Sequence, residues 1–488
     1  MGNFLRFPVQ AAQHGGGAFM IPYLAAFFLL GLPLMWIEWT IGRFGGGFEH
    51  STAPGMFHTL WHKNRFIKYF GAIGIFGPVM IFVYYTYVES WLAGYSVFAL
   101  LGKYDGCRTP EGMTAFLQAY QGKAGNEHFS GVGTAYLFFL ATFIANVGVV
   151  YFGIQRGIER VCKVLLPLLA AFAGVLMVRV LMLGAPEASR PEWNVVNGLG
   201  FLWNPDWSAL KDAKVWLAAA GQIFFTLSVG IGVILTYASY LRREDDVALS
   251  GLTSAAANEV AEVILGGSIV IPAAYAFFGP AMTAEVAQKG SYNLAFVTMP
   301  LVLERIAGGH VFGFLWFMLL FFAGITSSIS LAQPAVAFLE DEFNLSRKKA
   351  IAVFAGSTFV MCQGCIFLPG VLDELDFWAG TFCLVLFGTM ETILFGWVFG
   401  MDRAWTELHH GSDITIPRAY RFVIKYVTPV FLMVILGSWL WQSAPGVLGN
   451  RDPYVMGTRV GLVAFFLVLV VLVRVSWRRR EGHGEGRG

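Results

Sequence analysis

The run FTLSVGIG, residues 225–232, places one serine and two glycines in the centre of an apolar stretch that extends over residues 215–241. Each glycine in a helix interior costs about 1 kcal/mol relative to alanine. One interruption of this kind is also compatible with a simple packing notch. Combined with Gly2 and Asn3 at the head of the chain, it predicts a helix that unwinds in mid-membrane, which is tolerated only where the bared backbone lines a cavity.

The composition of the whole chain supports a membrane setting. The 488 residues are 56% hydrophobic and only 13% charged, whereas soluble domains carry roughly 25% charged residues. The net charge of +2 is too small for a nucleic-acid surface. The partner that this composition implies is the lipid bilayer; a homodimer is compatible with it.

Apolar runs of the length needed to cross a bilayer, about 20 residues, follow one another along the chain. Besides the interrupted run they cover residues 18–39, 66–101, 135–153, 164–183, 260–278, 312–339, 351–367, 377–399, 420–441 and 461–475. About eleven complete spans result, preceded by a fragment at residues 2–13. The sequence therefore predicts an all-α polytopic membrane protein.

The distribution of Lys and Arg predicts the orientation of these spans. Positive residues collect in alternate connections, which by the positive-inside rule are cytoplasmic: residues 63–68, 156–163, 242–243, 347–349, 418–425 and 478–480. The intervening connections are longer, carry fewer positive charges and face outward. We therefore expect a multi-pass protein of the cell (inner) membrane with a cytoplasmic C-terminus.

Two groups of polar side chains interrupt the predicted spans. Asn258 and Glu262 are four residues apart and therefore lie on one face of a helix. They are interpreted either as a helix end that reaches water or as an ion site, and the ionisable residue inside a span favours the site. Thr326, Ser327 and Ser328 point in three directions, so at least one hydroxyl must face a neighbouring helix, and hydroxyls with freed carbonyls suit hard cations such as Na⁺.

Four motifs in the expected order resemble the neurotransmitter:sodium symporter family, specifically its bacterial leucine transporter branch. They are GNFLRFP (2–8), WIEW (36–39), QIFFTLS (222–228) and AGITSS (323–328). The resemblance covers essentially the whole chain and implies an inverted five-helix repeat fold of twelve helices with the first incomplete. It divides the chain into a first repeat (1–183), a second repeat (184–400), and the last two helices with the tail (401–488). Because the chain begins at the unwound joint of the first helix, we expect about 20 to 25 further residues to be encoded upstream.

The resemblance also implies the residues of the sites. It assigns one sodium ion to Asn3, Thr226, Asn258 and the substrate carboxylate, and a second to the Ala323 carbonyl with Thr326 and Ser327. Glu262 would supply the negative charge that chloride supplies in other relatives. The substrate pocket would comprise Gly2, Ile81, Tyr85, Phe225, Thr226, Ser228, Ile231, Ser327 and Leu331. The outer gate would be Arg6 and Asp376, and the inner gate Tyr240 and Asp341, whose arginine partner belongs to the segment expected upstream.

The expected function is sodium-coupled symport of a neutral hydrophobic amino acid by alternating access, independent of chloride. Ile231 stands where the leucine transporter has phenylalanine, and the pocket offers no charged side chain to pair a charged substrate. An enzyme is not expected, because the histidines are scattered and neither H-E-x-x-H nor a phosphate-binding loop occurs. The alternative is a membrane sensor that binds an amino acid without transporting it, although little sequence follows the last span to form a signalling domain.

Overall fold

The computed structural model describes residues 2–482, and in this part of the chain most residues are helical and no β-strand forms. The chain forms two compact units that are described separately. The first comprises Met1–Ala26, Tyr85–Thr226 and Ala256–Ser328, and the second comprises Phe27–Tyr84, Leu227–Ala255 and Ile329–Gly488. Four helices contribute residues to both units: α6 (Ile73–Leu100), α11 (Ala213–Leu227), α13 (Val247–Glu259) and α17 (Gly309–Phe343).

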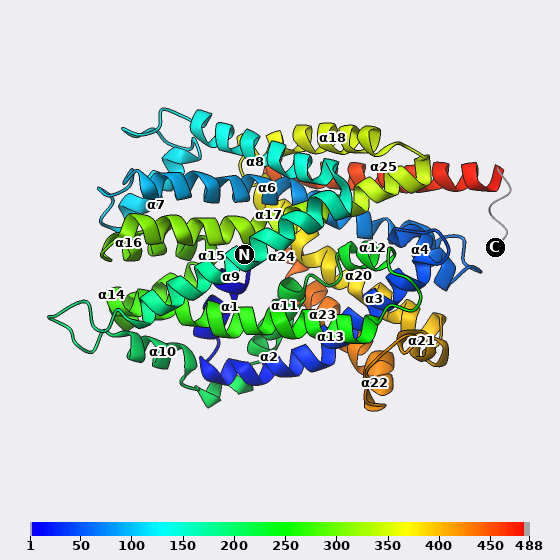
Figure 1. Ribbon diagram of the computed structural model, residues 1–488, viewed down its shortest axis with the longest axis horizontal. Coiled ribbons are helices and arrows are strands. Elements are labelled where there is room, and N and C mark those ends of the chain that lie inside the picture. The colour runs from blue at the N-terminus through cyan, green and yellow to red at the C-terminus, as the bar shows by residue number, and fades with distance from the viewer. Residues whose placement is uncertain (1, 483–488) are drawn as a thin grey trace. The chain divides into compact units, whose positions relative to one another are not determined.

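Within the first unit, α14, which is labelled in Figure 1, has the most extensive packing against other helices. The elements of this unit are α1 (Gly2–Gln13), η1 (Gly17–Phe19), α2 (Met20–Ala26), α7 (Pro110–Tyr120), α8 (Gly133–Tyr151), η3 (Ile154–Ile158), α9 (Glu159–Leu181), α10 (Val195–Trp203), η4 (Trp207–Lys211), η5 (Val260–Gly266), α14 itself (Gly267–Gln288), α15 (Ser291–Asn293), η6 (Leu294–Thr298) and α16 (Met299–Glu304). Helices α1 and α10 both pack on α14. Gly198 allows the approach of α10, because a Cβ there would lie 2.8 Å from the Cα of Pro272.

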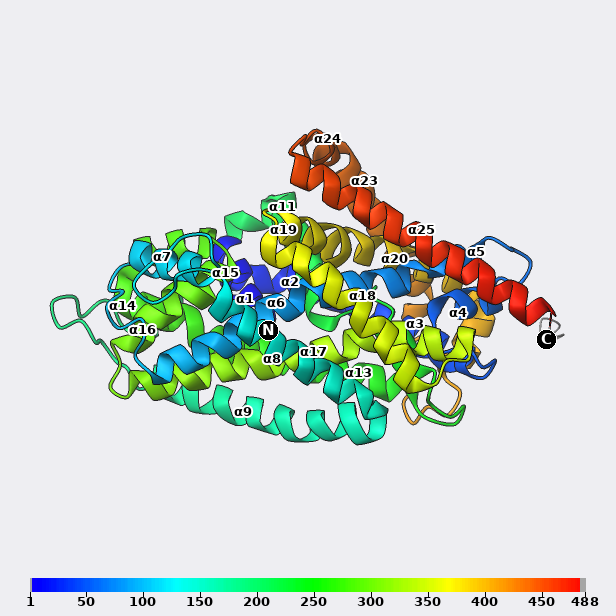
Figure 2. The ribbon, with the colours of Figure 1, turned by 90° about the horizontal axis from the view of Figure 1, so that it is seen from above.

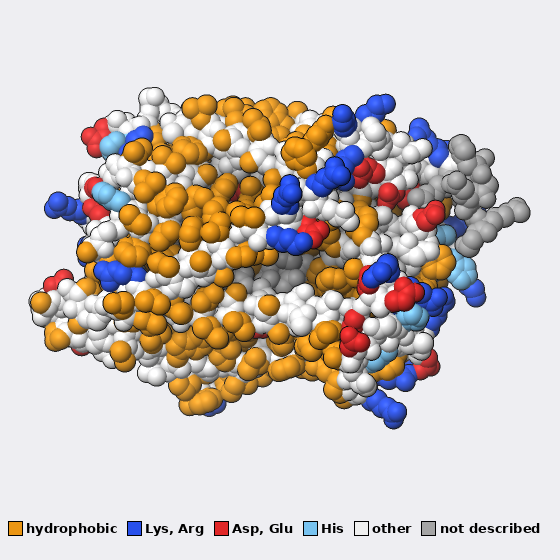
Figure 3. Space-filling view, viewed as in Figure 1, with side chains coloured by type: hydrophobic (Ala, Val, Ile, Leu, Met, Phe, Trp, Pro, Cys, Tyr) orange, Lys and Arg blue, Asp and Glu red, His pale blue; other side chains and the backbone are white. Residues whose placement is uncertain are grey.

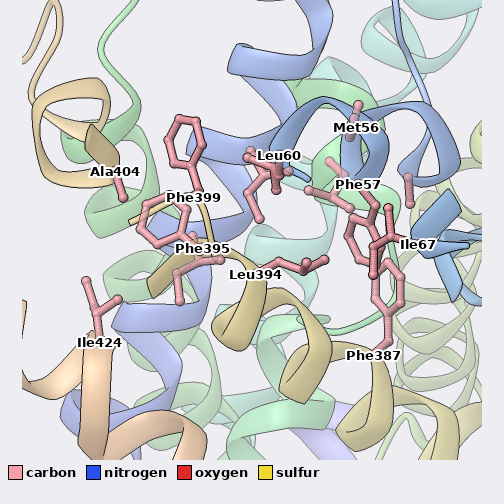
Figure 4. Packing of buried hydrophobic residues seen from close by; sticks show 14 of the residues in the cluster. Met56, Phe57, Leu60, Ile67, Phe387, Leu394, Phe395, Phe399, Ala404 and Ile424 are labelled. Carbon is pink, nitrogen blue, oxygen red and sulfur yellow. The ribbon is translucent and has the colours of Figure 1, made fainter. Parts of the chain in front are cut away.

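The second unit holds a continuous hydrophobic core. Its elements are η2 (Phe27–Gly31), α3 (Leu32–Gly46), α4 (Ala53–Leu60), α5 (Ile67–Gly71), α12 (Val233–Ala238), α18 (Arg347–Phe367), α19 (Val371–Phe377), η7 (Trp378–Phe382), α20 (Cys383–Ile393), η8 (Leu394–Val398), α21 (Met401–Leu408), α22 (Ala419–Phe422), η9 (Val423–Val427), α23 (Thr428–Gln442), α24 (Ala444–Leu448) and α25 (Pro453–Gly482). Phe57 and Phe387 stack in this core with ring centroids 5.3 Å apart (Figure 4). Helix α25, red in Figure 2, packs along α19, where Arg459 Nε donates to Glu374 at 2.7 Å.

Ten helical segments of the described chain are long and apolar enough to cross a membrane. The predicted eleventh span, residues 215–241, is instead two helices, because α11 ends at Leu227 and α12 begins at Val233. Ser228 (φ 55°), Gly230 (φ 75°) and Gly232 (φ 89°) adopt left-handed backbone conformations between them, which glycine tolerates best. The interruption that the sequence predicts is therefore present, and the chain is a multi-pass membrane protein.

Lipid-facing surface is visible on the first unit. Helix α9 exposes Val164, Leu166, Leu168, Val175, Val178 and Leu181, and hydrophobic side chains cover most of this face in Figure 3. A helix with so little of its apolar surface buried in protein is suited to hydrocarbon rather than to water.

Candidate functional site

The first three residues of α1 lie against η5, a π-helical turn in the span Val247–Gln288. The Asn3 side chain donates to Asn258 Oδ1 at 2.7 Å. Gly266 makes this approach possible, because a Cβ there would clash with the Asn3 carbonyl oxygen. The head of the chain and the middle of a long span are therefore joined through a side-chain amide pair.

Asn258 is the centre of a polar cluster within the first unit. Its Nδ2 donates to Thr226 Oγ1 at 2.9 Å and approaches Glu262 Oε2 at 3.5 Å. The structure thus brings together Asn3, Thr226, Asn258 and Glu262, which lie up to 259 positions apart in the sequence. Their amide, hydroxyl and carboxylate oxygens are hard donors of the kind that sodium prefers.

Glu262 is completely buried and is held by residues that the sequence analysis missed. Tyr23 donates its hydroxyl hydrogen to Glu262 Oε2 at 2.9 Å, and Gln222 Nε2 donates to Oε1. A buried carboxylate requires such donors or a cation. Gln222 is the first residue of the QIFFTLS motif, but the motif does not indicate what this side chain contacts. The only sequence signal for Tyr23 was its polar hydroxyl inside an apolar run, and this signal is weak because aromatic side chains are common in spans.

The predicted carboxylate end of the substrate pocket also lies in the first unit. A Cβ on Gly2 would clash with the Phe225 ring, so α1 begins directly against this aromatic side chain. The Arg6 guanidinium carbon lies 4.4 Å from the Phe225 ring centroid, within cation–π range. Tyr85 hydrogen-bonds with the side chain of Ser327.

The three consecutive hydroxyls of α17 hydrogen-bond partly within their own helix and partly with a neighbouring helix. Thr326 Oγ1 donates to the Phe322 carbonyl at 2.9 Å, and Ser327 Oγ donates to the Ala323 carbonyl at 3.0 Å. Ser328 Oγ instead donates to Asn146 Oδ1 on α8 at 2.6 Å. The expectation that at least one of the three hydroxyls faces a neighbouring helix is confirmed, through Ser328.

A second buried carboxylate, Glu89, belongs to the same network and was not predicted. Asn146 Nδ2 lies 3.3 Å from Glu89 Oε2, and Asn146 Oδ1 accepts from Ser328, so Asn146 links the hydroxyl to the carboxylate. Glu89, Asn146 and Ser328 are all completely buried. A Cβ on Gly324 would lie 3.1 Å from Glu89 Cγ, so the glycine of the AGITSS motif provides space for the acid.

The remaining predicted pocket residues, Ile81, Ser228, Ile231 and Leu331, belong to the second unit. Ile81, Ile231 and Leu331 are buried there. The non-helical segment between α11 and α12 is held by Glu38, whose Oε1 accepts from the Gly230 backbone N–H at 2.5 Å. Glu391, also completely buried, interacts electrostatically with Glu38; neither acid was predicted to act at the site, although Glu38 lies in the WIEW motif.

Two predicted gate residues of the second unit, Asp376 and Tyr240, have hydrogen-bond partners that the sequence did not indicate. Asp376 Oδ1 accepts from the Tyr84 hydroxyl at 2.6 Å. Tyr240 accepts from Gln333 Nε2 at 3.1 Å and interacts electrostatically with Asp341. Gln333 Oε1 in turn accepts from Arg347 Nη2 at 3.2 Å. Arg347 is therefore linked through Gln333 to Tyr240, one of the predicted inner-gate residues.

Comparison with known proteins agrees with these features. The model of the sodium:neurotransmitter symporter family matches residues 1–107 and 113–479. An uncharacterized sodium-dependent transporter of Methanocaldococcus jannaschii is 28% identical, covering 98% of this chain and 94% of the relative. A sodium-dependent nutrient amino acid transporter of Drosophila mojavensis is 25% identical over 89% of this chain and 72% of its own length.

Among solved structures, the crystal structure of MhsT in complex with L-phenylalanine is similar with a TM-score of 0.74 and 28% identity. The match covers 90% of this chain and 95% of that one. The fold is therefore that of a transporter rather than an enzyme. The family model matches nearly the whole chain, and the chain belongs to the sodium:neurotransmitter symporter family.

Proposed function

We propose that this symporter couples the inward movement of sodium to the uptake of a neutral hydrophobic amino acid, and that it does so without chloride. The observation that carries the proposal is the position of Glu262, whose Oε2 lies 3.5 Å from Asn258 Nδ2 in the cluster with Asn3 and Thr226. A permanent carboxylate beside a sodium site balances the cation's charge, so that no mobile anion is required. Asn3, Thr226 and Asn258 are the proposed ligands of this ion.

A second sodium ion is proposed at the Ala323 carbonyl with Thr326 and Ser327. All three oxygens lie within one turn of α17, where Ser327 Oγ and the Ala323 carbonyl are 3.0 Å apart. Binding of sodium there would exchange hydrogen bonds within the helix for ion–oxygen contacts. That exchange costs the protein less than burying a further negative charge.

The substrate class is supported by the residues proposed to line the pocket. Tyr85, the backbone of Gly2 and the first sodium ion would bind the carboxylate, and Phe225, Ile81, Ile231 and Leu331 would contact an uncharged side chain. MhsT was solved with L-phenylalanine, and the Drosophila relatives are nutrient amino acid transporters.

We further propose that Arg6 and Asp376 act at the outer gate and Tyr240 and Asp341 at the inner one. The proposed orientation is an inner-membrane protein with a cytoplasmic C-terminus.

The test is uptake by proteoliposomes loaded with potassium gluconate. Labelled phenylalanine, leucine, glutamate and lysine are presented with an inward sodium gradient, with chloride or gluconate as the anion. We expect accumulation of phenylalanine or leucine that disappears when sodium is replaced by potassium and is equal in both anions. Uptake restricted to chloride would refute the role of Glu262, and saturable binding without accumulation would establish the sensor instead.

A further inference from the structure

A charged groove is present in the second unit, and none of the residues proposed to bind ions or substrate or to form the gates lines it. It encloses about 720 Å³, within the range of roughly 300–1,000 Å³ typical of small-molecule sites. It is lined by residues 396–403, which extend from η8 into α21, and by residues 421–426, which extend from α22 into η9. Helices α21 and α22 are labelled in Figure 1. Its charged lining residues are Arg403, Arg421, Lys425 and Asp402, which leaves an excess of positive charge.

The groove lies at the ends of two candidate spans. One candidate span ends at Val398 and the next begins at Ala419. The lining residues 396–403 surround the first of these ends, and the lining residues 421–426 lie in the first two turns of the second span. Trp397 and Tyr426 line the groove and are each 45% exposed. Aromatic side chains at span ends are typical of the membrane–water interface.

The walls of the groove are fixed by contacts within the second unit. Trp397 Nε1 donates to the Lys425 carbonyl at 2.6 Å, which joins the two segments. A Cβ at Gly396 would lie 3.4 Å from Lys425 Cα, which is ordinary van der Waals contact, so the two segments are in contact at this point. The Arg403 guanidinium carbon lies 4.6 Å from the Phe399 ring centroid, so this cation is held over a buried aromatic side chain.

An apolar track leads out of the groove along the surface. Phe422 and Tyr426 line the groove, and Val430, Met433 and Val434 follow at spacings of three or four residues, which places them on one side of α23. All five side chains are more than one-third exposed. A ligand with an anionic head and a hydrocarbon tail would match both parts.

We propose that this groove is a binding site for an anionic phospholipid, with the phosphate contacted by Arg403, Arg421 and Lys425 and one acyl chain lying along Phe422, Tyr426 and α23. Arg421 pairs with Asp402, whose side chain is 94% exposed, so the phosphate competes with a solvated carboxylate. Positive side chains next to a span are attracted to anionic lipids. The groove adds shape and an apolar track, which scattered surface cations lack. The proposal is independent of the transported substrate.

The test uses the fluorescence of Trp397 in nanodiscs of phosphatidylcholine containing increasing fractions of brominated phosphatidylglycerol or brominated phosphatidylcholine. The Trp397 contribution is the difference between the wild-type protein and Trp397→Phe. We expect the brominated anionic lipid to quench this contribution at a lower fraction than the brominated neutral lipid. In Arg403→Gln/Arg421→Gln/Lys425→Gln the preference should fall by on the order of fivefold for each cation removed.

The matched control is Arg156→Gln/Arg160→Gln/Lys163→Gln, which removes three exposed cations from another span end and should keep the preference. Arg421→Gln alone serves as a milder variant if the triple variant does not fold, and should show part of the loss. Equal quenching by the two lipids, or an equal loss in the control variant, would overturn the proposal. The proposal would also be overturned if inorganic phosphate alone prevented all quenching of Trp397 by the brominated anionic lipid, because the site would then bind a free anion.

Discussion

Asn3 Nδ2 donates to Asn258 Oδ1 at 2.7 Å, so the two side-chain amides that are proposed to bind sodium are hydrogen-bonded to each other. Asn258 uses its own Nδ2 for Thr226 at 2.9 Å, which leaves its oxygen directed at Asn3. An amide N–H cannot bind a cation, so at the proposed site only the amide oxygens of Asn3 and Asn258 could contact sodium. The hydrogen bond between the two side chains would hold them together for that contact.

Replacing Asn258 with Ala should weaken sodium binding. The substitution removes one of a few oxygen ligands and leaves the Asn3 amide without this acceptor, so we expect the sodium concentration for half-maximal uptake to rise about tenfold or more, equivalent to at least about 1.4 kcal/mol. The measurement is the sodium dependence of initial uptake in proteoliposomes. Thr253→Ala is the control, since Thr253 is exposed and its hydroxyl bonds only within α13; an unchanged sodium dependence in Asn258→Ala would exclude this ligand.

Replacing Glu262 with Ser should create a requirement for chloride. The serine removes the negative charge but keeps a hydroxyl, and the vacated volume beside Gln222 and Tyr23 can accept an anion. We expect uptake by the variant to be several-fold faster in chloride than in gluconate, while the wild-type protein shows no difference. Equal rates in the two anions would mean that Glu262 does not substitute for chloride.

The helical architecture was predictable because hydrophobic runs of span length dominate the sequence. The fragment at residues 2–13 was predicted with the same bounds as α1, and the interruption near Gly230 followed from two glycines in an apolar run. One span was misjudged: the predicted run 260–278 lies inside a segment that extends over Val247–Gln288. The polar residues between Ala248 and Glu259 lowered the local hydropathy and hid the first half of this helix.

The partners of the site residues were less predictable than the residues themselves. Tyr23 and Glu262 are 239 positions apart, and Asn146 and Ser328 are 182 apart; no local pattern specifies such pairs. Glu89 was overlooked because a single acid in a long apolar helix carries no spacing information. Only packing in three dimensions shows that Asn146 donates to Glu89 and accepts from Ser328.

Substitutions of Glu38 can show whether the segment between α11 and α12 requires the negative charge of this residue or only its hydrogen-bond acceptor for Gly230. Glu38→Gln keeps an oxygen that can accept from the Gly230 N–H, whereas Glu38→Leu leaves that donor unpaired, at a cost of about 1–3 kcal/mol. We expect Glu38→Gln to retain uptake and Glu38→Leu to lose most of it, with uptake and surface expression measured together. Equal loss in the two variants would show that the charge, and not the accepting oxygen, is required.

The Glu89–Asn146 pair should show energetic coupling. Asn146→Leu removes a donor from a buried acid, and Glu89→Met removes the acid itself, so each single variant should lower thermal stability. The double variant should lose less than the sum of the two, by about 0.5–3 kcal/mol. The measurement is a double-mutant cycle of unfolding in detergent, and additive effects would indicate that Asn146 does not stabilise Glu89.

Gly266 should be intolerant of a side chain for a steric reason alone. Its backbone is helical (φ −61°), so alanine is not strained there, yet its Cβ would clash with the Asn3 carbonyl oxygen. The first turn of α1 would have to shift, which we expect to lower stability by about 1–3 kcal/mol and to raise the sodium concentration for half-maximal uptake, since Asn3 moves away from Asn258. Gly148→Ala is the matched control: Gly148 lies within α8, a Cβ there would meet no atom within 4 Å, and alanine favours the helix by up to about 1 kcal/mol. Thermal unfolding in detergent and sodium-dependent uptake should therefore separate the two variants, and a Gly266→Ala protein as stable and as active as Gly148→Ala would show that α1 does not press against η5 in the working transporter.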